Sequence, residues 1–308
     1  MTGRQERQQE KENRFKAKLS RQWLSYYDYL TAGGYLYTTR ISYTQKAMRF
    51  VKTVGGVKNI TFSSVVSYLS KFNEGSDSNK AQVWYALKEY FTYLELNGEI
   101  DHNFCKDIPA TTVKDDVKQV YMNAEELNFV LDNIEKDNIS EQWKVRNKAI
   151  VRVLMVTGIR LSALLELNLS DFDSEKRMLH VVDKGKKVFN KEIDEETNNV
   201  LTMWCKCREE MLLGMNMDAL FLTNRLKRLT EKSVRGIVKK YTKDLEKHIT
   251  PHKFRSSYAS NLYLMTKDPV RVQRSLGHSQ LRTTERYIAG LEYNDGETVS
   301  LISNLLKK

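Results

Sequence analysis

The chain has 308 residues and a formal net charge of +11, because 50 Lys and Arg residues outnumber 39 Asp and Glu residues. Apolar residues make up 41% of the chain, enough to bury a core, which excludes wholesale disorder. The low counts of 14 Gly and 3 Pro exclude collagen-like and low-complexity architectures and favour helices. The apolar stretches are too short to span a bilayer, and residues 1–18 lack the apolar core of a signal peptide.

Charge and cysteine content give the first positive indications. With a pI near 9.3, the chain is compatible both with a polyanionic partner such as nucleic acid and with a merely basic protein. The three cysteines form an odd, sparse set, which predicts no disulfide framework and fits a reducing cytoplasm. At this length two domains are the default expectation.

The first third of the chain predicts a helical domain. Residues 1–14 carry almost no apolar side chains and predict a flexible basic tail. Over residues 15–104 apolar side chains recur at helical spacing in four runs, which predicts a compact helical bundle. Its aromatic residues follow the same spacing and are interpreted as core, with a base-stacking surface as the alternative. Residues 105–120 break the pattern and predict an interdomain linker.

A second domain is predicted over residues 121–308. Asn123 is followed by two glutamates, which is typical of a helix start, and this helix is predicted to run to about residue 134. Further helices are predicted over 143–156 and 159–167 from the apolar spacing. The order of these elements predicts that helices form most of this domain as well.

The rest of this domain combines a short hairpin with helices. Two β-like runs at 178–182 and 188–193 flank a glycine-containing turn and predict the hairpin, and everything after about residue 195 is predicted to be helical. The predicted helix 230–247 has one apolar face. At helical spacing on another face lie four basic residues, Lys232, Arg235, Lys239 and Lys243. This stripe is interpreted either as a phosphate-contacting surface of a DNA-binding protein or as a solvated basic face.

Several chemistries are missing at the level of motifs. The sequence has no G-x-x-x-x-G-K-[ST] phosphate loop and no H-E-x-x-H zinc motif. Cys205 and Cys207 have the wrong spacing for a zinc site and are interpreted as two side chains on a helix. The sequence therefore predicts neither a metal nor a small-molecule cofactor.

Two segments place basic side chains in unusual settings. Arg160 follows a glycine turn in an otherwise apolar stretch, and burying its guanidinium is costly unless an anion pairs with it. That anion is either a nearby carboxylate such as Glu166 or an incoming phosphate. His252 and Arg255 are three residues apart and share a helix face, which suits a proton-transfer group beside a fixed set of donors to a phosphodiester.

A third segment contains Gly277-His278 and, nine residues after the histidine, Tyr287. A tyrosine is a poor nucleophile at neutral pH because its ordinary pKa is about 10. It attacks phosphorus only if a base removes its proton and cations stabilise the developing charge. The chain offers His252 as the base, and cations at Lys184 and at the two arginines named above.

Together these segments resemble the tyrosine recombinase (phage integrase) family over about residues 121–291. The matching pieces, in family order and spacing, are TGIR at 157–160, Lys184 in DKGKK, HKFR at 252–255, LGH at 276–278 and Tyr287 in TTERY. Residues 15–104 resemble the family's helical core-binding, DNA-binding domain in size, helix count and position. The resemblance implies a mainly α fold with a small β-hairpin or sheet, and a catalytic domain over 121–308 with the DNA breaking-rejoining fold.

The resemblance also implies roles for single residues. Tyr287 would attack the scissile phosphate, forming a 3′-phosphotyrosyl link and releasing a 5′-hydroxyl. Arg160 and Arg255 would hold the non-bridging oxygens, where charge grows in the transition state. His252 would take and return the tyrosine proton, and His278 would hydrogen-bond the phosphate.

Lys184 would protonate the leaving 5′-oxygen. Lys186 and Lys187 are close by, but the position before Gly185 matches the family's lysine best. The covalent link conserves the phosphodiester's energy, so that strand exchange would need neither ATP nor a metal ion.

The family resemblance further implies double-stranded DNA as the partner and a homotetramer on two DNA sites, with strand exchange through a Holliday junction. Residues 292–308 would form a C-terminal tail that docks on a neighbouring protomer, and the protein would act in the cytoplasm on the nucleoid. Ala163 stands where the family usually has an acidic residue, and Ser256 where it often has histidine. Two alternatives therefore stay open, a DNA-binding module with attenuated cleavage and a type IB topoisomerase-like relaxing enzyme.

Overall fold

The computed structural model describes residues 3–74, 76–110, 120–182, 188–277 and 284, and the chain divides into two compact units, Met1–Asp115 and Asp116–Lys308. The boundary between the units lies within the segment predicted as a linker. No helix among the described residues is long and apolar enough to cross a membrane.

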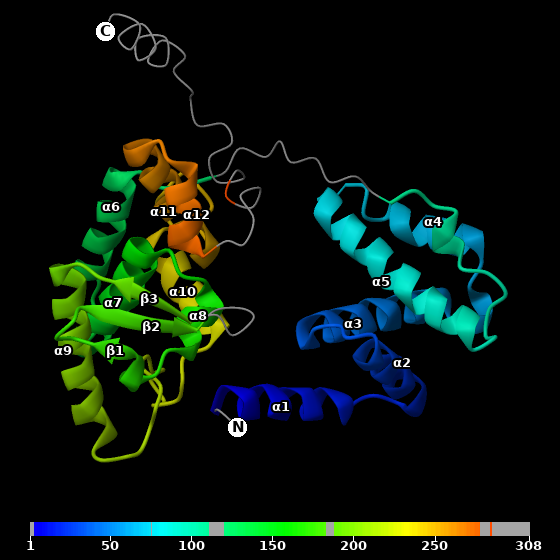
Figure 1. Ribbon diagram of the computed structural model, residues 1–308, viewed down its shortest axis with the longest axis horizontal. Coiled ribbons are helices and arrows are strands. Elements are labelled where there is room, and N and C mark those ends of the chain that lie inside the picture. The colour runs from blue at the N-terminus through cyan, green and yellow to red at the C-terminus, as the bar shows by residue number, and fades with distance from the viewer. Residues whose placement is uncertain (1–2, 75, 111–119, 183–187, 278–283, 285–308) are drawn as a thin grey trace, which may run out of the picture. The chain divides into compact units, whose positions relative to one another are not determined.

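The N-terminal unit is a helical bundle (Figure 1). Its helices are α1 (Gly3–Lys16), α2 (Arg21–Ala32), α3 (Tyr37–Val54), α4 (Phe62–Ser70) and α5 (Asp77–Leu96), with 3₁₀ turns η1 (Val57–Asn59) and η2 (Phe104–Lys106). Helices α2, α3 and α4 all pack against α5. The aromatic side chains fill this core: Tyr26 and Tyr90 are fully buried, with ring centroids 4.9 Å apart. The interpretation of the aromatic residues as core is confirmed.

The prediction of a flexible tail over residues 1–14 is wrong for residues 3–14, which lie in α1. Polar contacts hold α1 against the bundle, because Glu12 accepts a hydrogen bond from the Tyr27 hydroxyl at 2.9 Å and pairs with Arg40 at 2.9 Å. Phe15 adds a ring contact to Tyr27 at 5.7 Å between centroids. Apolar spacing could not find this helix, since mostly polar side chains attach it.

The start of the predicted linker belongs to the N-terminal unit. Cys105 is fully buried in its core, and the Trp84 indole donates to the Ile108 carbonyl at 3.0 Å. Asn103 anchors the same turn by donating to the Lys88 carbonyl at 2.9 Å. Residues 111–119 lie outside the described residues.

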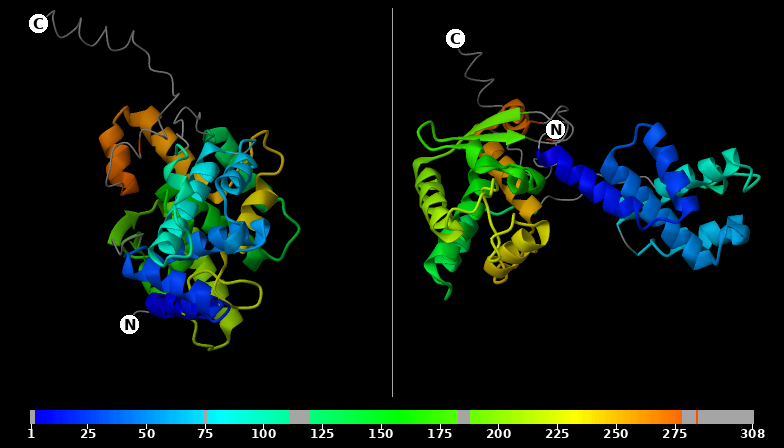
Figure 2. Two further views of the ribbon diagram at one scale, coloured as in Figure 1. Left: turned by 90° about the vertical axis from the view of Figure 1, so that its right-hand side faces the viewer. Right: turned by 90° about the horizontal axis from the view of Figure 1, so that it is seen from below.

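The C-terminal unit packs helices against a small sheet, which lies on one side of them (Figure 2). Its helices are α6 (Ala124–Glu135), α7 (Glu141–Thr157), α8 (Leu161–Glu166), α9 (Glu195–Leu212), α10 (Glu231–Tyr241), α11 (Pro251–Thr266) and α12 (Pro269–Leu276). Helix α7 is central and packs against α6, α8, α9 and α11. The predicted start of α6 is confirmed by a capping box, in which Asn123 and Glu126 accept from each other's backbone N–H at 2.9 Å.

The sheet has three antiparallel strands in the order β1-β2-β3: β1 (Phe172–Asp173), β2 (Met178–Val182) and β3 (Val188–Glu192). The predicted hairpin corresponds to β2 and β3, in which Leu179 pairs with Lys191 and Val181 with Phe189. Leu179 and Val181 are buried, so this register turns Phe189 and Lys191 toward the helices.

The prediction that everything after residue 195 is helical is wrong for residues 213–230. There the chain turns at Leu213 and Leu226, both with positive φ, and makes isolated bridges between Asn168 and Ala219 and between Leu222 and Arg228. The apolar run Ala219–Leu222 within this segment is buried in the core. Helix α10 ends at Tyr241, so Lys243 lies beyond the helix that was predicted to carry it.

Candidate active site

The turn between α7 and α8 positions Arg160. Helix α7 ends at Gly158, whose φ of +59° is the left-handed conformation that favours glycine. Arg160 then takes an extended conformation (φ −69°, ψ 146°) as the residue before α8 and is half-buried. The glycine thereby reverses the chain and brings an arginine into a site lined by helix ends.

Arg255 joins this turn to two other elements. It lies in the second turn of α11, which begins with Pro251 at its first position, and its side chain is 3% exposed. One terminal nitrogen, Nη1, donates to the Gly158 carbonyl at 2.8 Å, and Nη2 donates to the Leu276 carbonyl at the end of α12 at 2.9 Å. The three segments singled out in the sequence therefore meet at this one guanidinium.

His252 lies one turn before Arg255 on α11 and is exposed. Desolvation first, and then the positive charges of Arg255, Lys253 and Arg160, lower the pKa of its imidazole below the ordinary value. A lowered pKa favours the neutral ring at pH 7, which is the form able to accept a proton. The same influence shows that Arg160 and Arg255, two of the three cations predicted for the site, lie close to the predicted base.

The structure adds Lys191, which sequence reasoning missed. It lies on β3, is largely buried, and its ammonium group donates a hydrogen bond to the Ser275 carbonyl near the end of α12. Burial, and then the positive charge of Arg255, lower its pKa to about 8. The available signal was its place between Phe189 and Ile193 on the inward face of the predicted strand, where an apolar residue is expected.

Two further contacts fix the end of α12. Gly277 ends the helix with a φ of +66°, and a Cβ atom there would lie 2.5 Å from the Phe189 ring. The Tyr258 hydroxyl lies 2.5 Å from the Ser275 hydroxyl. Strand β3 and helix α11 thus hold the residues immediately before His278.

Three predicted site residues, Lys184, His278 and Tyr287, lie outside the described residues. The described residues bring together Arg160, His252 and Arg255. Of the two departures from the family pattern, Ala163 is 2% exposed and Ser256 is 0% exposed, so small side chains fill packed positions there.

The predicted DNA-contact stripe is partly retained. Lys232, Arg235 and Lys239 are exposed on α10, and Arg235 is paired with Glu231 at 2.7 Å. Lys243 follows the helix and does not continue the stripe.

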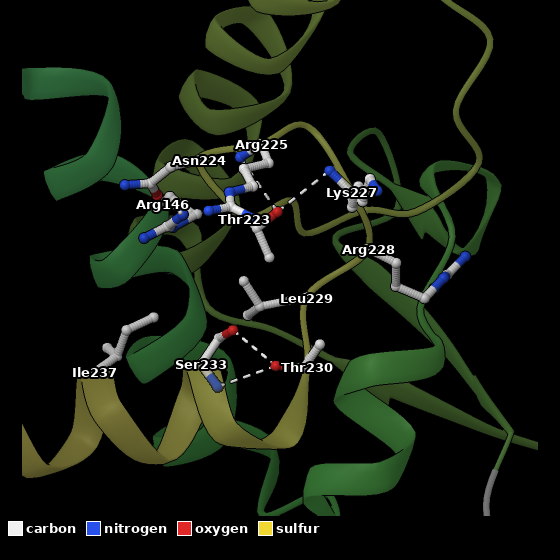
Figure 3. A pocket seen from close by; sticks show the side chains of 10 residues that line it. All are labelled: Arg146, Thr223, Asn224, Arg225, Lys227, Arg228, Leu229, Thr230, Ser233 and Ile237. Carbon is white, nitrogen blue, oxygen red and sulfur yellow. Dashed lines mark hydrogen bonds between the residues drawn. The ribbon is translucent and has the colours of Figure 1, made fainter.

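A basic pocket of about 430 Å³ lies at the start of α10 (Figure 3). Its lining has no acidic side chain and consists of Arg146, Thr223, Asn224, Arg225, Lys227, Arg228, Leu229, Thr230, Ser233 and Ile237. The buried Arg146 donates to the Leu222 carbonyl and to the Asn224 side chain at 2.9 and 3.0 Å, both neutral acceptors. Its positive charge is therefore not cancelled by these contacts, and the pocket favours an anion.

A family model described as the phage integrase family matches residues 120–292, which is more than half of the chain. The chain belongs to the phage integrase family. By that membership it is a tyrosine recombinase, and the resemblance seen in the sequence is confirmed. Among the described residues, no group of three or more His, Cys, Asp or Glu side chains is placed to hold a metal ion.

Relatives of this integrase-family chain include proteins named tyrosine recombinase XerC. The XerC of Mannheimia succiniciproducens is 31% identical over 204 residues, which cover 66% of this chain and 67% of the relative. The XerC of Leptospira interrogans is 27% identical over 235 residues, covering 76% and 74%. The matched segments span roughly two thirds to three quarters of these relatives.

Solved structures of this family share the fold. A lambda integrase dimer bound to a COC′ core site has a TM-score of 0.67 at 20% identity, covering 89% of this chain and 78% of that one. The XerH site-specific recombinase bound to palindromic difH substrate, in a post-cleavage complex, has a TM-score of 0.65 at 23% identity, covering 87% and 80%. The predicted fold class, mainly helical with a small sheet, is confirmed.

Replacing Gly158 by alanine should disturb the site through its backbone. A Cβ atom there would lie 2.6 Å from the Tyr258 ring, and the φ of +59° disfavours any L side chain. We expect the Gly158→Ala variant of this integrase-family chain to lose about 1–3 kcal/mol in free energy of unfolding, measured by urea denaturation. Gly236→Ala on α10, where a Cβ meets nothing within 4 Å, is the control and should gain up to about 1 kcal/mol. Equal stabilities for the two variants would contradict this account.

Lys191 should make stability depend on pH in an unusual direction. Its pKa is about 8 in the folded chain and 10.5 ordinarily, so between these values the unfolded chain binds more protons. The free energy of unfolding of the wild type relative to Lys191→Met should therefore rise from pH 8 to 10.5, by at most about 3 kcal/mol. Lys176→Met is the control, because pairing with Asp173 raises the pKa of Lys176 and gives a contribution that is lost as pH rises. If the difference in free energy of unfolding between the wild type and Lys191→Met did not change with pH, the Lys191 ammonium would not be desolvated.

Proposed function

We propose that this chain is a site-specific DNA recombinase in which Tyr287 cleaves one DNA strand at a time. The observation that supports this most is the meeting of three distant segments at Arg255, in a chain of the phage integrase family. Those segments supply two arginines and a histidine with a lowered pKa, which suits a phosphodiester substrate.

The reaction follows from the chemistry of these groups. The Tyr287 oxygen forms a bond to the scissile phosphorus while the bond from phosphorus to the 5′-oxygen breaks. Arg160 and Arg255 hold the non-bridging oxygens, on which negative charge grows. His252 accepts the tyrosine proton, and general base catalysis of this kind contributes about 10²–10⁴ in rate. The 3′-phosphotyrosyl link is then attacked by another strand's 5′-hydroxyl, which reverses the same step.

Two roles rest on the sequence match, because the residues lie outside the described part of the chain. Lys184 donates the proton that the departing 5′-oxygen needs, and His278 hydrogen-bonds the phosphate. The linkage to tyrosine conserves the energy of the phosphodiester, so that rejoining needs no ATP. We assign strand exchange to a homotetramer on two DNA sites, passing through a Holliday junction, with residues 292–308 docking on a neighbouring protomer.

DNA contacts away from the reaction are assigned to the catalytic unit's basic surface. Lys232 and Lys239 project from α10, and the basic pocket lies at the start of that helix. Arg225 and Lys227 line the pocket on the turn before α10. These cations contact the phosphate backbone and hold the duplex without reading its sequence.

Covalent capture tests the proposed reaction directly. In the native host, cells are denatured, the protein is isolated, and any DNA still attached is sequenced for the wild type and for Tyr287→Phe. We expect attached DNA with a common end from the wild type and none from the variant, because phenylalanine lacks the attacking oxygen. The common end would also define the target site.

Other outcomes of the capture experiment favour other functions. Absence of covalent DNA from both proteins, with tight non-covalent binding in cross-linked controls, would favour a DNA-binding module with attenuated cleavage. Relaxation of a plasmid that lacks any captured site would favour a type IB topoisomerase-like activity.

The salt dependence of binding tests the basic surface. On a random-sequence duplex, the logarithm of the association constant decreases linearly with the logarithm of the salt concentration. The steepness of this line decreases by about 0.9 for each phosphate contact removed. We expect the double variant Lys232→Ala, Lys239→Ala to reduce the slope by up to about 2, measured by fluorescence anisotropy. Lys206→Ala, which removes an exposed charge from α9, is the control and should leave the slope unchanged. An unchanged slope in the double variant would mean that α10 presents only a solvated basic face.

A further inference from the structure

Lys191 is a half-buried cation that the reaction described above does not use. It lies on β3 directly opposite Leu179, which is fully buried, and so occupies the inward face of the sheet. Strand alternation predicts an apolar side chain at that position. Burying an ammonium group is costly unless its hydrogen bonds are replaced, so its partners indicate why a lysine is placed there.

The partner of Lys191 is the last turn of α12. The carbonyls of a helix's last turn receive no hydrogen bond from the helix itself and need donors from elsewhere. The Lys191 ammonium donates to the Ser275 carbonyl, and Arg255 donates to the next carbonyl, that of Leu276, at 2.9 Å. Two cations from two different elements thus bind two consecutive carbonyls. The negative end of the helix dipole strengthens both contacts.

This arrangement holds two positive charges close together inside the protein. Arg255 is one of the two causes that lower the pKa of Lys191, the other being burial. The repulsion opposes folding, so stability alone does not explain the lysine. Sites that bind charged reactants commonly carry such unfavourable charge, because the reactant compensates it. A phosphate held by Arg255 would supply that compensation.

We propose that Lys191 is a positioning residue for DNA cleavage: together with Arg255 it fixes the C-terminal end of α12, from which the chain continues to His278 and Tyr287. The inference rests on the proposed function and adds a residue to it. Phe189, two residues earlier on β3, supports the same end by packing where a side chain on Gly277 would lie. Strand β3 therefore contacts the end of α12 through both of its inward side chains.

The test compares Lys191→Met, which keeps the length of the side chain, with Lys191→Arg, which keeps a cationic donor. Without DNA, hydrogen exchange in the peptide covering α12 should be faster in Lys191→Met than in the wild type. Urea denaturation at neutral pH should show that this variant is at least as stable as the wild type, because a buried charge is gone.

Cleavage is measured on a duplex carrying the site recovered by covalent capture. We expect Lys191→Met to form the covalent complex about 10–100-fold more slowly, as is typical when a group that orients an active-site side chain is lost. Its dissociation constant for the duplex should change by less than about twofold. Lys191→Arg should recover most of the rate. Lys176→Met, which replaces an exposed lysine in the turn between β1 and β2, should behave as wild type.

Two results would overturn the inference. Unchanged exchange at α12 in Lys191→Met would show that the lysine does not hold this end, whatever the outcome with DNA. A loss of cleavage accompanied by a matching loss of stability would make Lys191 a structural residue only. If the wild type itself captures no DNA, the proposed function fails, while the exchange measurement still decides whether Lys191 holds α12.

Discussion

The candidate site depends on the Arg255 guanidinium, which donates to the Gly158 carbonyl and to the Leu276 carbonyl from a buried position. Each contact uses a carbonyl at a helix end that ordinary helix bonding leaves without a donor. One side chain thus satisfies two helix ends and fixes their separation. In the sequence Arg160 follows the first carbonyl by two residues and His278 follows the second by two, so this arginine fixes the backbone just before both residues.

The carbonyls that accept hydrogen bonds from these cations bring no negative charge into the site. Neutral acceptors replace the hydrogen bonds of the guanidinium and of the Lys191 ammonium but do not cancel their charges. Partial desolvation first, and then the positive charge of Arg255, lower the pKa of both Lys191 and His252. In the proposed reaction, the same field that disfavours protons on these side chains would attract a phosphate, so that binding and proton transfer would have one electrostatic origin.

Sequence patterns predicted most elements because apolar periodicity records burial, and most elements here bury one face. They failed where polar contacts or backbone conformation decide the structure. Helix α1 is attached through Glu12, and the segment around Leu213 and Leu226 turns at positive φ, which no apolar period records. Arg160 was singled out because it follows a glycine turn in an otherwise apolar stretch, and Arg255 because it shares a helix face with His252; the family resemblance then assigned both to one site. Lys191 was missed although it alternates with Phe189 and Ile193 in the predicted strand, because the register of β3 with β2 is what shows that this face of the strand points inward.

The contact between β3 and α12 also links the proposed general acid, Lys184, to the proposed nucleophile, Tyr287. In the proposed reaction Lys184 precedes β3 in the sequence, and Tyr287 follows α12. Through Lys191 and Phe189, β3 contacts the end of α12 directly, so the described anchors of both groups form one packed unit. A displacement of either anchor is therefore transmitted to the other, because packed interiors shift as units rather than residue by residue. In the proposed reaction, proton donation and nucleophilic attack would both depend on this contact, which Phe189 and Lys191 of β3 make.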